Sequence, residues 1–204
     1  MVPKIEFRWS WIYEQEMHNS FVKSEKDIKR RERQIKKFIN NVRKEWNKKE
    51  SKILKFMAKI TGLNWKTKNI VCYVIWLSEK GPISDPLTIP IQLKVGKKVF
   101  KLTPQRFIDI LVHELIHNLF IQNKKVDKYF DYLIKKKYKK ESMVTAIHVP
   151  VHAIHKEIYL KFFNKKRLKI EKEICKSYSD YTKAWEIVER EGSKKIIEEL
   201  KNFY

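Results

Sequence analysis

The sequence predicts an α+β fold in which a small mixed or antiparallel sheet precedes a helix with the motif His-Glu-x-x-His. Strand-like alternation and short apolar runs are confined to the region before residue 103, and apolar residues recur every three or four positions in most other segments. With 204 residues, of which 43% are hydrophobic, we expect a single domain, made of an N-terminal extension (1–65), a central core (66–162) and C-terminal helices (163–204).

The N-terminal extension is expected to hold a strand and a long basic helix. Apolar residues at positions 5, 7, 9 and 11 alternate with polar ones, which is typical of a half-buried strand. Ser24 is a good N-cap, and the stretch after it carries apolar residues on one side and basic residues on the other as far as Gly62. Such a helix either has a solvated outer face or contacts a polyanion.

The central core begins with three predicted strands. Residues 70–77 are predicted to form a buried strand, residues 87–94 a second strand, and residues 99–102 a short third strand after a turn at Gly96. Pro90 marks the second as an edge strand, because proline has no N–H to donate to a neighbouring strand.

The rest of the chain is predicted to be mainly helical. Thr103 is a good N-cap and Pro104 suits a first turn, so a helix should begin at about residue 104. The segment 124–140 contains a lysine-rich run, residues 135–140, that suggests an exposed linker between two helices. The remaining predicted helices are 141–160, with a kink or break at Pro150, and 165–190 and 193–203.

His113, Glu114 and His117 form the most informative part of the sequence. Residues four apart lie on one face of a helix, so both imidazoles are able to bind the same Zn²⁺ ion. Glu114 lies beside them, close enough to a water molecule at the metal to act as a general base. The helix around them is apolar on a wide surface, so the motif should be buried; the alternative is a pair of hydrogen-bonded core histidines.

A second group of polar residues should lie on one face of the helix that starts at Glu141. They recur at steps of four and three among apolar neighbours: Glu141, Thr145, His148, His152, His155 and Tyr159. His148 has two candidate roles, as the third zinc ligand or as a catalytic group that stabilises the oxyanion formed during amide hydrolysis. His152 and His155 are interpreted as supporting or structural residues.

Around the motif, the chain resembles the zincin metallopeptidases, which have uncharged residues beside the two histidines. The metzincin branch of that family is excluded, because the positions of its glycine and its third histidine hold Phe120 and Asn123. Residues 70–160 are most similar to the small archaeal minigluzincins, which belong to the gluzincin branch.

The gluzincin resemblance implies that the third zinc ligand is a glutamate on a second helix. Glu141 is the first candidate, since it follows His117 by 141 − 117 = 24 residues. His148 is the second candidate, and Asp127 or Asp131 come next, because zinc accepts all of these ligand types.

The resemblance implies a zinc metallopeptidase that hydrolyses peptides or proteins. Glu114 would take a proton from the attacking water and pass it to the leaving amine. Extended substrate would pair with an edge strand, for which residues 89–93 are the candidate. Asp109, one turn before His113, is a candidate acceptor for the spare imidazole N–H.

Two other functions are open alternatives. A SprT-like DNA-associated protease has a histidine as third ligand, so His148 would replace Glu141 and the basic surface would bind DNA. The second alternative is a non-catalytic nucleic-acid-binding protein with a structural zinc site. Its DNA binding would persist after Glu114→Gln, and the parent would show no cleavage activity.

The formal net charge of +22 favours anionic partners such as nucleic acid or another polyanion. The lysine-rich composition of hyperthermophile proteins explains the charge equally well. Cys72 and Cys175 indicate neither a disulfide framework nor a cysteine metal cluster. The longest apolar run, residues 70–77, is too short to cross a membrane, and the N-terminus lacks the apolar core of a signal peptide, so we expect a cytoplasmic protein without a membrane partner.

Overall fold

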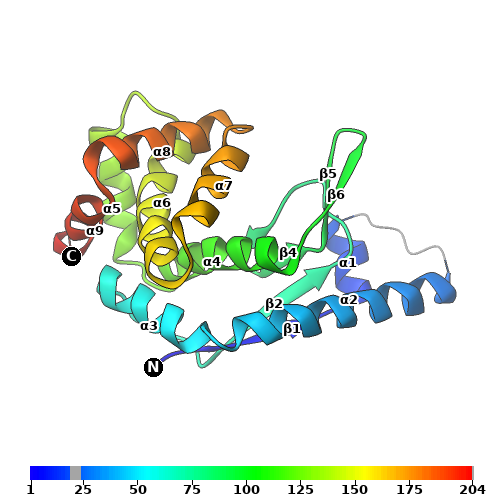
Figure 1. Cartoon of the computed structure of the whole chain (residues 1–204). Coiled ribbons are helices and arrows are strands. Elements are labelled where there is room, and N and C mark those ends of the chain that lie inside the picture. Colours follow the sequence, from blue (N-terminus) through cyan, green and yellow to red (C-terminus); the bar gives the residue numbers. More distant parts are fainter. Residues whose placement is uncertain (19–23, 204) are drawn as a thin grey trace. The chain divides into compact units, whose positions relative to one another are not determined.

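The computed structural model of the chain describes residues 1–18 and 24–203, and Figure 1 shows its ribbon. The fold is α+β, as predicted. Contacts between Cα atoms divide the chain into two compact units, which we call the sheet unit (Val2–Ser51 and Thr67–Asn118) and the helical unit (Lys52–Lys66 and Leu119–Tyr204, with Met1). Within the described ranges, no helix combines the length and the apolar character that crossing a membrane requires.

The sheet unit contains a four-stranded sheet and a hairpin. The sheet has the order β1-β2-β4-β3, formed by β1 (Lys4–Arg8), β2 (Asn69–Ile75), β4 (Leu87–Pro90) and β3 (Ile83–Ser84). β1 and β4 are parallel to β2, whereas β3 is antiparallel to β4. The hairpin joins β5 (Gln92–Val95) to β6 (Lys98–Lys101) through a turn at Gly96, whose φ is +59°.

The observed strands differ in extent from the predicted ones. The strand predicted for residues 4–11 ends at Arg8, because Ser10 accepts a hydrogen bond from the amide of Tyr13 and begins helix α1 (Trp11–His18). The strand predicted for residues 87–94 is divided into β4 and β5. β4 lies inside the sheet rather than at its edge, but β3 pairs only with the first two residues of β4, so Pro90 meets a strand on one side only.

The long basic helix predicted after Ser24 is divided into α2 (Glu25–Trp46) and α3 (Glu50–Thr61). Ser24 caps α2 as predicted, since its hydroxyl accepts a hydrogen bond from the Asp27 amide. The break occurs where the Lys49 amide donates to the carbonyl of Trp46. Gly62 ends α3 with a φ of +69°, a conformation that favours glycine.

Helix α4 (Pro104–Ile121) begins where the sequence predicted. The Thr103 hydroxyl accepts a 3.1 Å hydrogen bond from the Arg106 amide, which caps the helix. Phe107 is fully buried, and its ring contacts Phe7 of β1 and Phe38 of α2 at centroid distances of 6.0 and 5.4 Å. These contacts pack the first part of α4 against the strand and the helix at the core of the sheet unit.

The helical unit is centred on α6 (Met143–Phe162), which contacts η1, α7, α8 and α9. Its other elements are α5 (Val126–Tyr132), the π-helix η1 (Leu133–Lys137), α7 (Lys165–Cys175), α8 (Ser179–Glu191) and α9 (Ser193–Asn202). The linker predicted for residues 135–140 is wrong for residues 135–137, which lie in η1, whereas Lys139 and Lys140 lie in the exposed turn after it. Lys128, Lys135 and Lys136 are exposed on helical turns whose inner side buries Val126, Tyr129 and Leu133.

Two further differences concern helix ends. Pro150 lies inside α6 without ending it, which costs the helix a single backbone hydrogen bond in an element that packs against several others. The helix predicted for residues 165–190 is divided into α7 and α8, because the Tyr178 amide turns back to the Cys175 carbonyl. Gly192, with φ +88°, separates α8 from α9 as predicted.

Candidate metal centre

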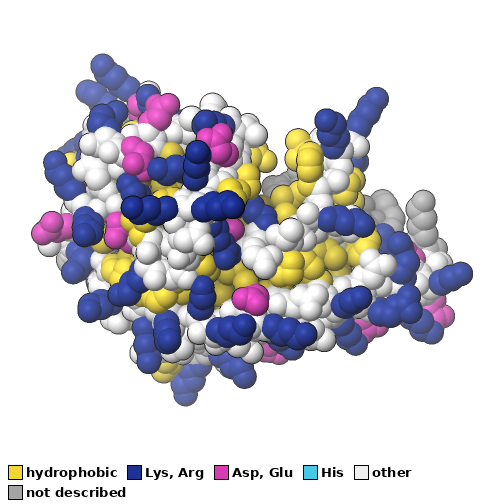
Figure 2. All heavy atoms as spheres, viewed as in Figure 1, with side chains coloured by type: hydrophobic (Ala, Val, Ile, Leu, Met, Phe, Trp, Pro, Cys, Tyr) yellow, Lys and Arg dark blue, Asp and Glu magenta, His cyan; other side chains and the backbone are white. Residues whose placement is uncertain are grey.

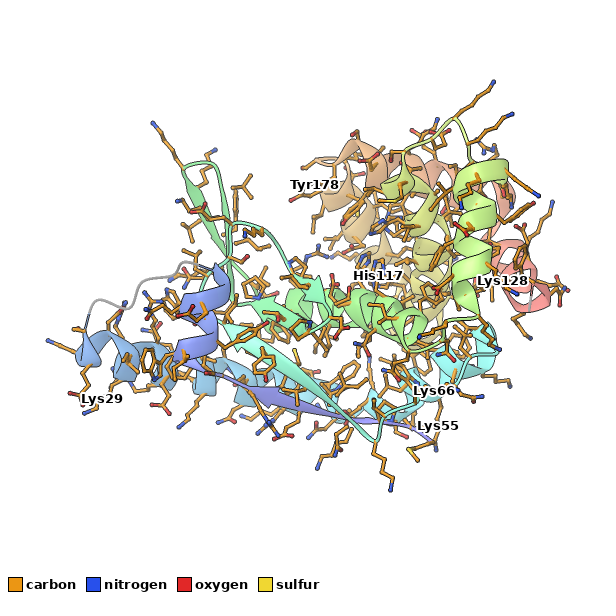
Figure 3. All side chains as sticks on the ribbon, turned by 180° about the vertical axis from the view of Figure 1, so that it is seen from behind. Lys29, Lys55, Lys66, His117, Lys128 and Tyr178 are labelled. Atoms are coloured by element: carbon orange, nitrogen blue, oxygen red, sulfur yellow. The ribbon has the colours of Figure 1, made fainter. Side chains whose placement is uncertain are left out.

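Helix α4 presents His113 and His117 on one face, and Figure 3 labels His117. Their Nε2 atoms are 3.3 Å apart, and their ring centroids are 5.0 Å apart. Two nitrogen ligands of a tetrahedral Zn²⁺ ion, each bound at about 2.0–2.1 Å, lie about 3.3 Å from each other. The pair thus has the separation that shared ligation requires, although a direct hydrogen bond between the rings gives the same distance.

Glu114 is buried beside this pair, with 6% of its surface exposed. Its Oε2 accepts a 2.6 Å hydrogen bond from Ser84 Oγ of β3, and Asn118 Nδ2 of α4 donates a 3.0 Å hydrogen bond to the Ser84 carbonyl. Burial raises the pKa of Glu114 to about 7, against the opposing effect of the Ser84 hydrogen bond. A carboxyl group in this pKa range is suited to take up and return a proton near neutral pH.

His148 lies on α6 with its imidazole held in one orientation. Its Nδ1 is 2.8 Å from the carbonyl oxygen of Val144, which only accepts hydrogen bonds, so Nδ1 carries the proton and Nε2 keeps its lone pair. The Tyr181 ring of α8 packs against the imidazole at a centroid distance of 4.3 Å. Burial lowers the pKa of His148, which favours the neutral form that binds metal.

His113 and His117 belong to the sheet unit and His148 to the helical unit. Among residues 1–18 and 24–203, these three histidines are the one group of His, Cys, Asp or Glu side chains that could hold a metal ion. His148 is buried and the other two are partly exposed. The donor set fits a metal such as Zn²⁺, because three neutral imidazoles are a known zinc ligand set that leaves one position open.

Glu141 lies outside this group of three histidines. Helix α6 begins at Met143 because the Ser142 hydroxyl accepts a 3.0 Å hydrogen bond from the Thr145 amide, and Glu141 therefore lies in the turn before the helix rather than on its face. Thr145 donates to the backbone carbonyl of Asp180 in α8. Its side chain thus joins two helices.

The other candidate ligands also lie outside the group. Asp127 and Asp131 lie on α5, and the Asp131 carboxylate pairs with Lys135 at 2.8 Å. His152 is buried with its ring stacked on Trp185 of α8 at 4.4 Å, and the buried His155 ring contacts Tyr159 at 4.6 Å. Such contacts fit the structural interpretation of both histidines.

Three contacting residues were not assigned a role from the sequence. Ser84 and Tyr181 carry no local signal, because they reach Glu114 and His148 through tertiary contacts across 30 and 33 residues of chain. Asn118 had one weak signal, since it follows Glu114 by one helical turn and so lies on the same face of α4. Asp109 is buried one turn before His113, and its role as an imidazole partner stays a prediction.

Comparisons of the chain with protein-family models, with curated proteins and with solved structures found no match.

Proposed function

We propose that the chain is a zinc-dependent metallopeptidase in which His113, His117 and His148 hold the metal and Glu114 is the general base. The observation that carries this proposal is the 3.3 Å approach of the Nε2 atoms of His113 and His117, with the buried Glu114 next to His113 in the sequence. In the sequence analysis His148 was the second candidate for the third ligand. The position of Glu141 before α6 favours His148 over it.

The chemistry of the donors supports zinc and hydrolysis. Three neutral imidazoles would leave the positive charge of a bound zinc ion uncompensated, and such an ion would polarise a carbonyl oxygen and acidify water. The nearby carboxylate is buried and has a raised pKa, as a group that exchanges protons during catalysis requires. As a ligand, His148 would no longer be free to stabilise an oxyanion.

The residues of this chain would act in two proton transfers. Glu114 accepts a proton from water as the oxygen attacks the amide carbonyl, and it then delivers that proton to the nitrogen of the leaving amine. Ser84 holds the carboxylate through Oε2, so Oε1 is the oxygen left for the transfer. The hydrogen bond from His148 Nδ1 to Val144 fixes the tautomer that presents Nε2 to the metal.

Metal content tests the ligand set. Purified parent protein is compared by elemental mass spectrometry with His113→Ala, His148→Ala and, as a matched control on the same segment, Glu141→Gln. We expect about one zinc per chain in the parent and in Glu141→Gln, and a large loss in both histidine variants. Loss in Glu141→Gln with retention in His148→Ala would replace the three-histidine site by one with a glutamate ligand.

Peptidase activity is tested separately with a library of internally quenched peptides. We expect cleavage by the zinc-loaded parent and none by zinc-loaded Glu114→Gln. Zinc bound stoichiometrically by the three histidines, with no cleavage of peptides or unfolded proteins, would contradict the enzymatic part of the proposal and leave a structural metal site.

A further inference from the structure

Helix α2 has a basic outer face on the sheet unit. Its inner face buries Arg31, Ile35, Ile39, Val42 and Trp46, and Arg31 forms a 2.7 Å ion pair with the buried carboxylate of Glu14. The opposite face is dominated by lysine and arginine, whose side chains are visible along α2 in Figure 2. These buried side chains and the Arg31–Glu14 ion pair fix the rotation of α2 about its axis, and they therefore determine which cations face outward.

The outward cations differ in whether they form ion pairs. Lys29 and Lys36 form ion pairs with Glu25 and Glu32 one turn earlier, both at 2.6 Å. Arg33, Lys37 and Lys44 are exposed and form no ion pair within the described part of the chain. These three, which we call the cation row, lie four and seven residues apart and so share one side of the helix.

The cation row lines a shallow groove on the helix surface together with Asn40, Asn41, Lys29 and the ion pair of Glu32 with Lys36. Arg33 and Lys37 repel each other, because like charges at a spacing of four residues are neighbours on a helix. Asn40 adds an amide at the position between Lys37 and Lys44. The row therefore offers charged and neutral hydrogen-bond donors at regular intervals, and a regularly spaced anion outside the chain would relieve the repulsion.

We propose that the cation row binds the phosphodiester backbone of a nucleic acid. From Arg33 to Lys44 the helix rises about 16 Å, which corresponds to about five phosphates along one strand of a duplex. Such contacts are independent of base sequence, and the net charge of +22 adds a long-range attraction. An anionic membrane surface fits less well, because none of the exposed large apolar side chains of the described residues lies on α2.

The test compares two triple variants of the full chain with the same net charge, 22 − 3 = +19. The row variant carries Arg33→Gln, Lys37→Gln and Lys44→Gln. The matched control carries Lys128→Gln, Lys139→Gln and Lys169→Gln, which are exposed positions of the helical unit. Binding to a fluorescent DNA duplex of about 20 base pairs is followed by anisotropy over a series of salt concentrations, and thermal melting checks that each variant is folded.

Loss of three phosphate contacts should lower the slope of log K against log salt by about 2.7 and weaken binding on the order of 100-fold near physiological salt. The control should change binding by less than about threefold, because its charges act only through the weak long-range field. Equal losses in the two variants would overturn the proposal. So would row-dependent binding to vesicles containing phosphatidylserine without binding to the duplex.

This proposal is independent of the metal centre. Glu114→Gln and His148→Ala should bind the duplex as the parent does, so a failure of the proposed peptidase leaves the cation row testable. If His148→Ala abolished duplex binding while remaining folded, the cation row would not be the binding surface.

Discussion

Ser84 Oγ of β3 and Glu114 Oε2 of α4 are joined by a 2.6 Å hydrogen bond within the sheet unit. Ser84 is the donor, so the bond favours the ionised carboxylate and opposes the effect of burial on the pKa of Glu114. Asn118 holds the Ser84 backbone at the same time. A residue of a two-residue strand thereby orients the proposed base and lowers its proton affinity.

Removing the Ser84 hydroxyl should impair the base without releasing the metal. We expect Ser84→Ala to lower kcat about tenfold, the equivalent of about 1.4 kcal/mol, and to move the acid limb of the pH–rate profile to higher pH, because the pKa of Glu114 rises further. Zinc content should stay at the parental level. Ser84→Thr keeps a hydroxyl and is the matched control; a parental profile in Ser84→Ala would rule out this positioning role.

Glu114→Gln separates metal binding from catalysis. The amide keeps the size of the side chain but cannot accept the proton from water, so we expect kcat to fall by about 10²–10⁴-fold. Zinc should remain bound, because the proposed ligands are the histidines. Steady-state kinetics on a cleaved peptide and elemental analysis of the same sample give both readouts, and full activity of this variant would assign the base elsewhere.

Zinc should stabilise the folded chain through the three histidines. At a free zinc concentration about 100 times Kd, the free energy of unfolding rises by about 2.7 kcal/mol, which raises Tm by about 5–10 °C in a chain of this size. His148→Ala should show little of this shift in calorimetry, whereas Glu141→Gln should show all of it. An undiminished shift in His148→Ala would mean that zinc binds elsewhere.

Glu191 should contribute a pH-dependent term to the stability of the helical unit. Burial opposes its ionisation, but a 3.0 Å ion pair with Lys137 and a 2.9 Å hydrogen bond from the Tyr138 hydroxyl outweigh burial and lower its pKa. A lowered folded pKa stabilises the protein above the unfolded pKa of about 4.3, and this contribution disappears as pH falls through the folded pKa.

We therefore expect Glu191→Gln to cost about 1 kcal/mol in urea unfolding at neutral pH and much less in acid below the lowered pKa. Glu198→Gln, at an exposed position one turn before Asn202 in α9, is the control and should be close to neutral at both pH values. A cost of Glu191→Gln that is the same at both pH values would show that ionisation of this carboxyl is not the cause.

Phe107 should be essential to the sheet unit. Its fully buried ring contacts Phe7 and Phe38, so Phe107→Ala leaves a cavity and should cost about 3–5 kcal/mol of unfolding free energy. Phe100 of β6 is 51% exposed, and Phe100→Ala should cost less than about 0.5 kcal/mol. Chemical denaturation of both variants checks this difference, and equal costs would contradict the assigned packing.

The features that depend on residues close together in the sequence could be predicted from it. Thr103 and Pro104 place the start of α4, and the spacing of His113 and His117 places both on one face of it. The boundary of α6 was decided by one hydrogen bond, in which Ser142 rather than an earlier residue caps the helix. That difference of two residues leaves Glu141 outside the helix on whose face it had been predicted.

Features that depend on residues far apart in the chain could not be predicted. No periodicity links Ser84 to Glu114, because strand pairing and helix packing bring them together only in the folded sheet unit. Similarly, lysines outnumber apolar residues between 124 and 140, and only packing against α6 shows that Leu133 is a core residue. Composition alone therefore suggested a linker at residues 135–140, where the structure has the end of η1.

The β5–β6 hairpin has a consequence for association between chains. Within the described residues β6 pairs only with β5, so its outer edge presents free backbone N–H and C=O groups next to the exposed side chains of Val99 and Phe100. Such an edge is a template for pairing with another strand. Lys97, Lys98 and Lys101 place three positive charges along this edge. Two copies of the chain brought edge to edge would therefore repel each other. We infer that these lysines oppose aggregation through β6.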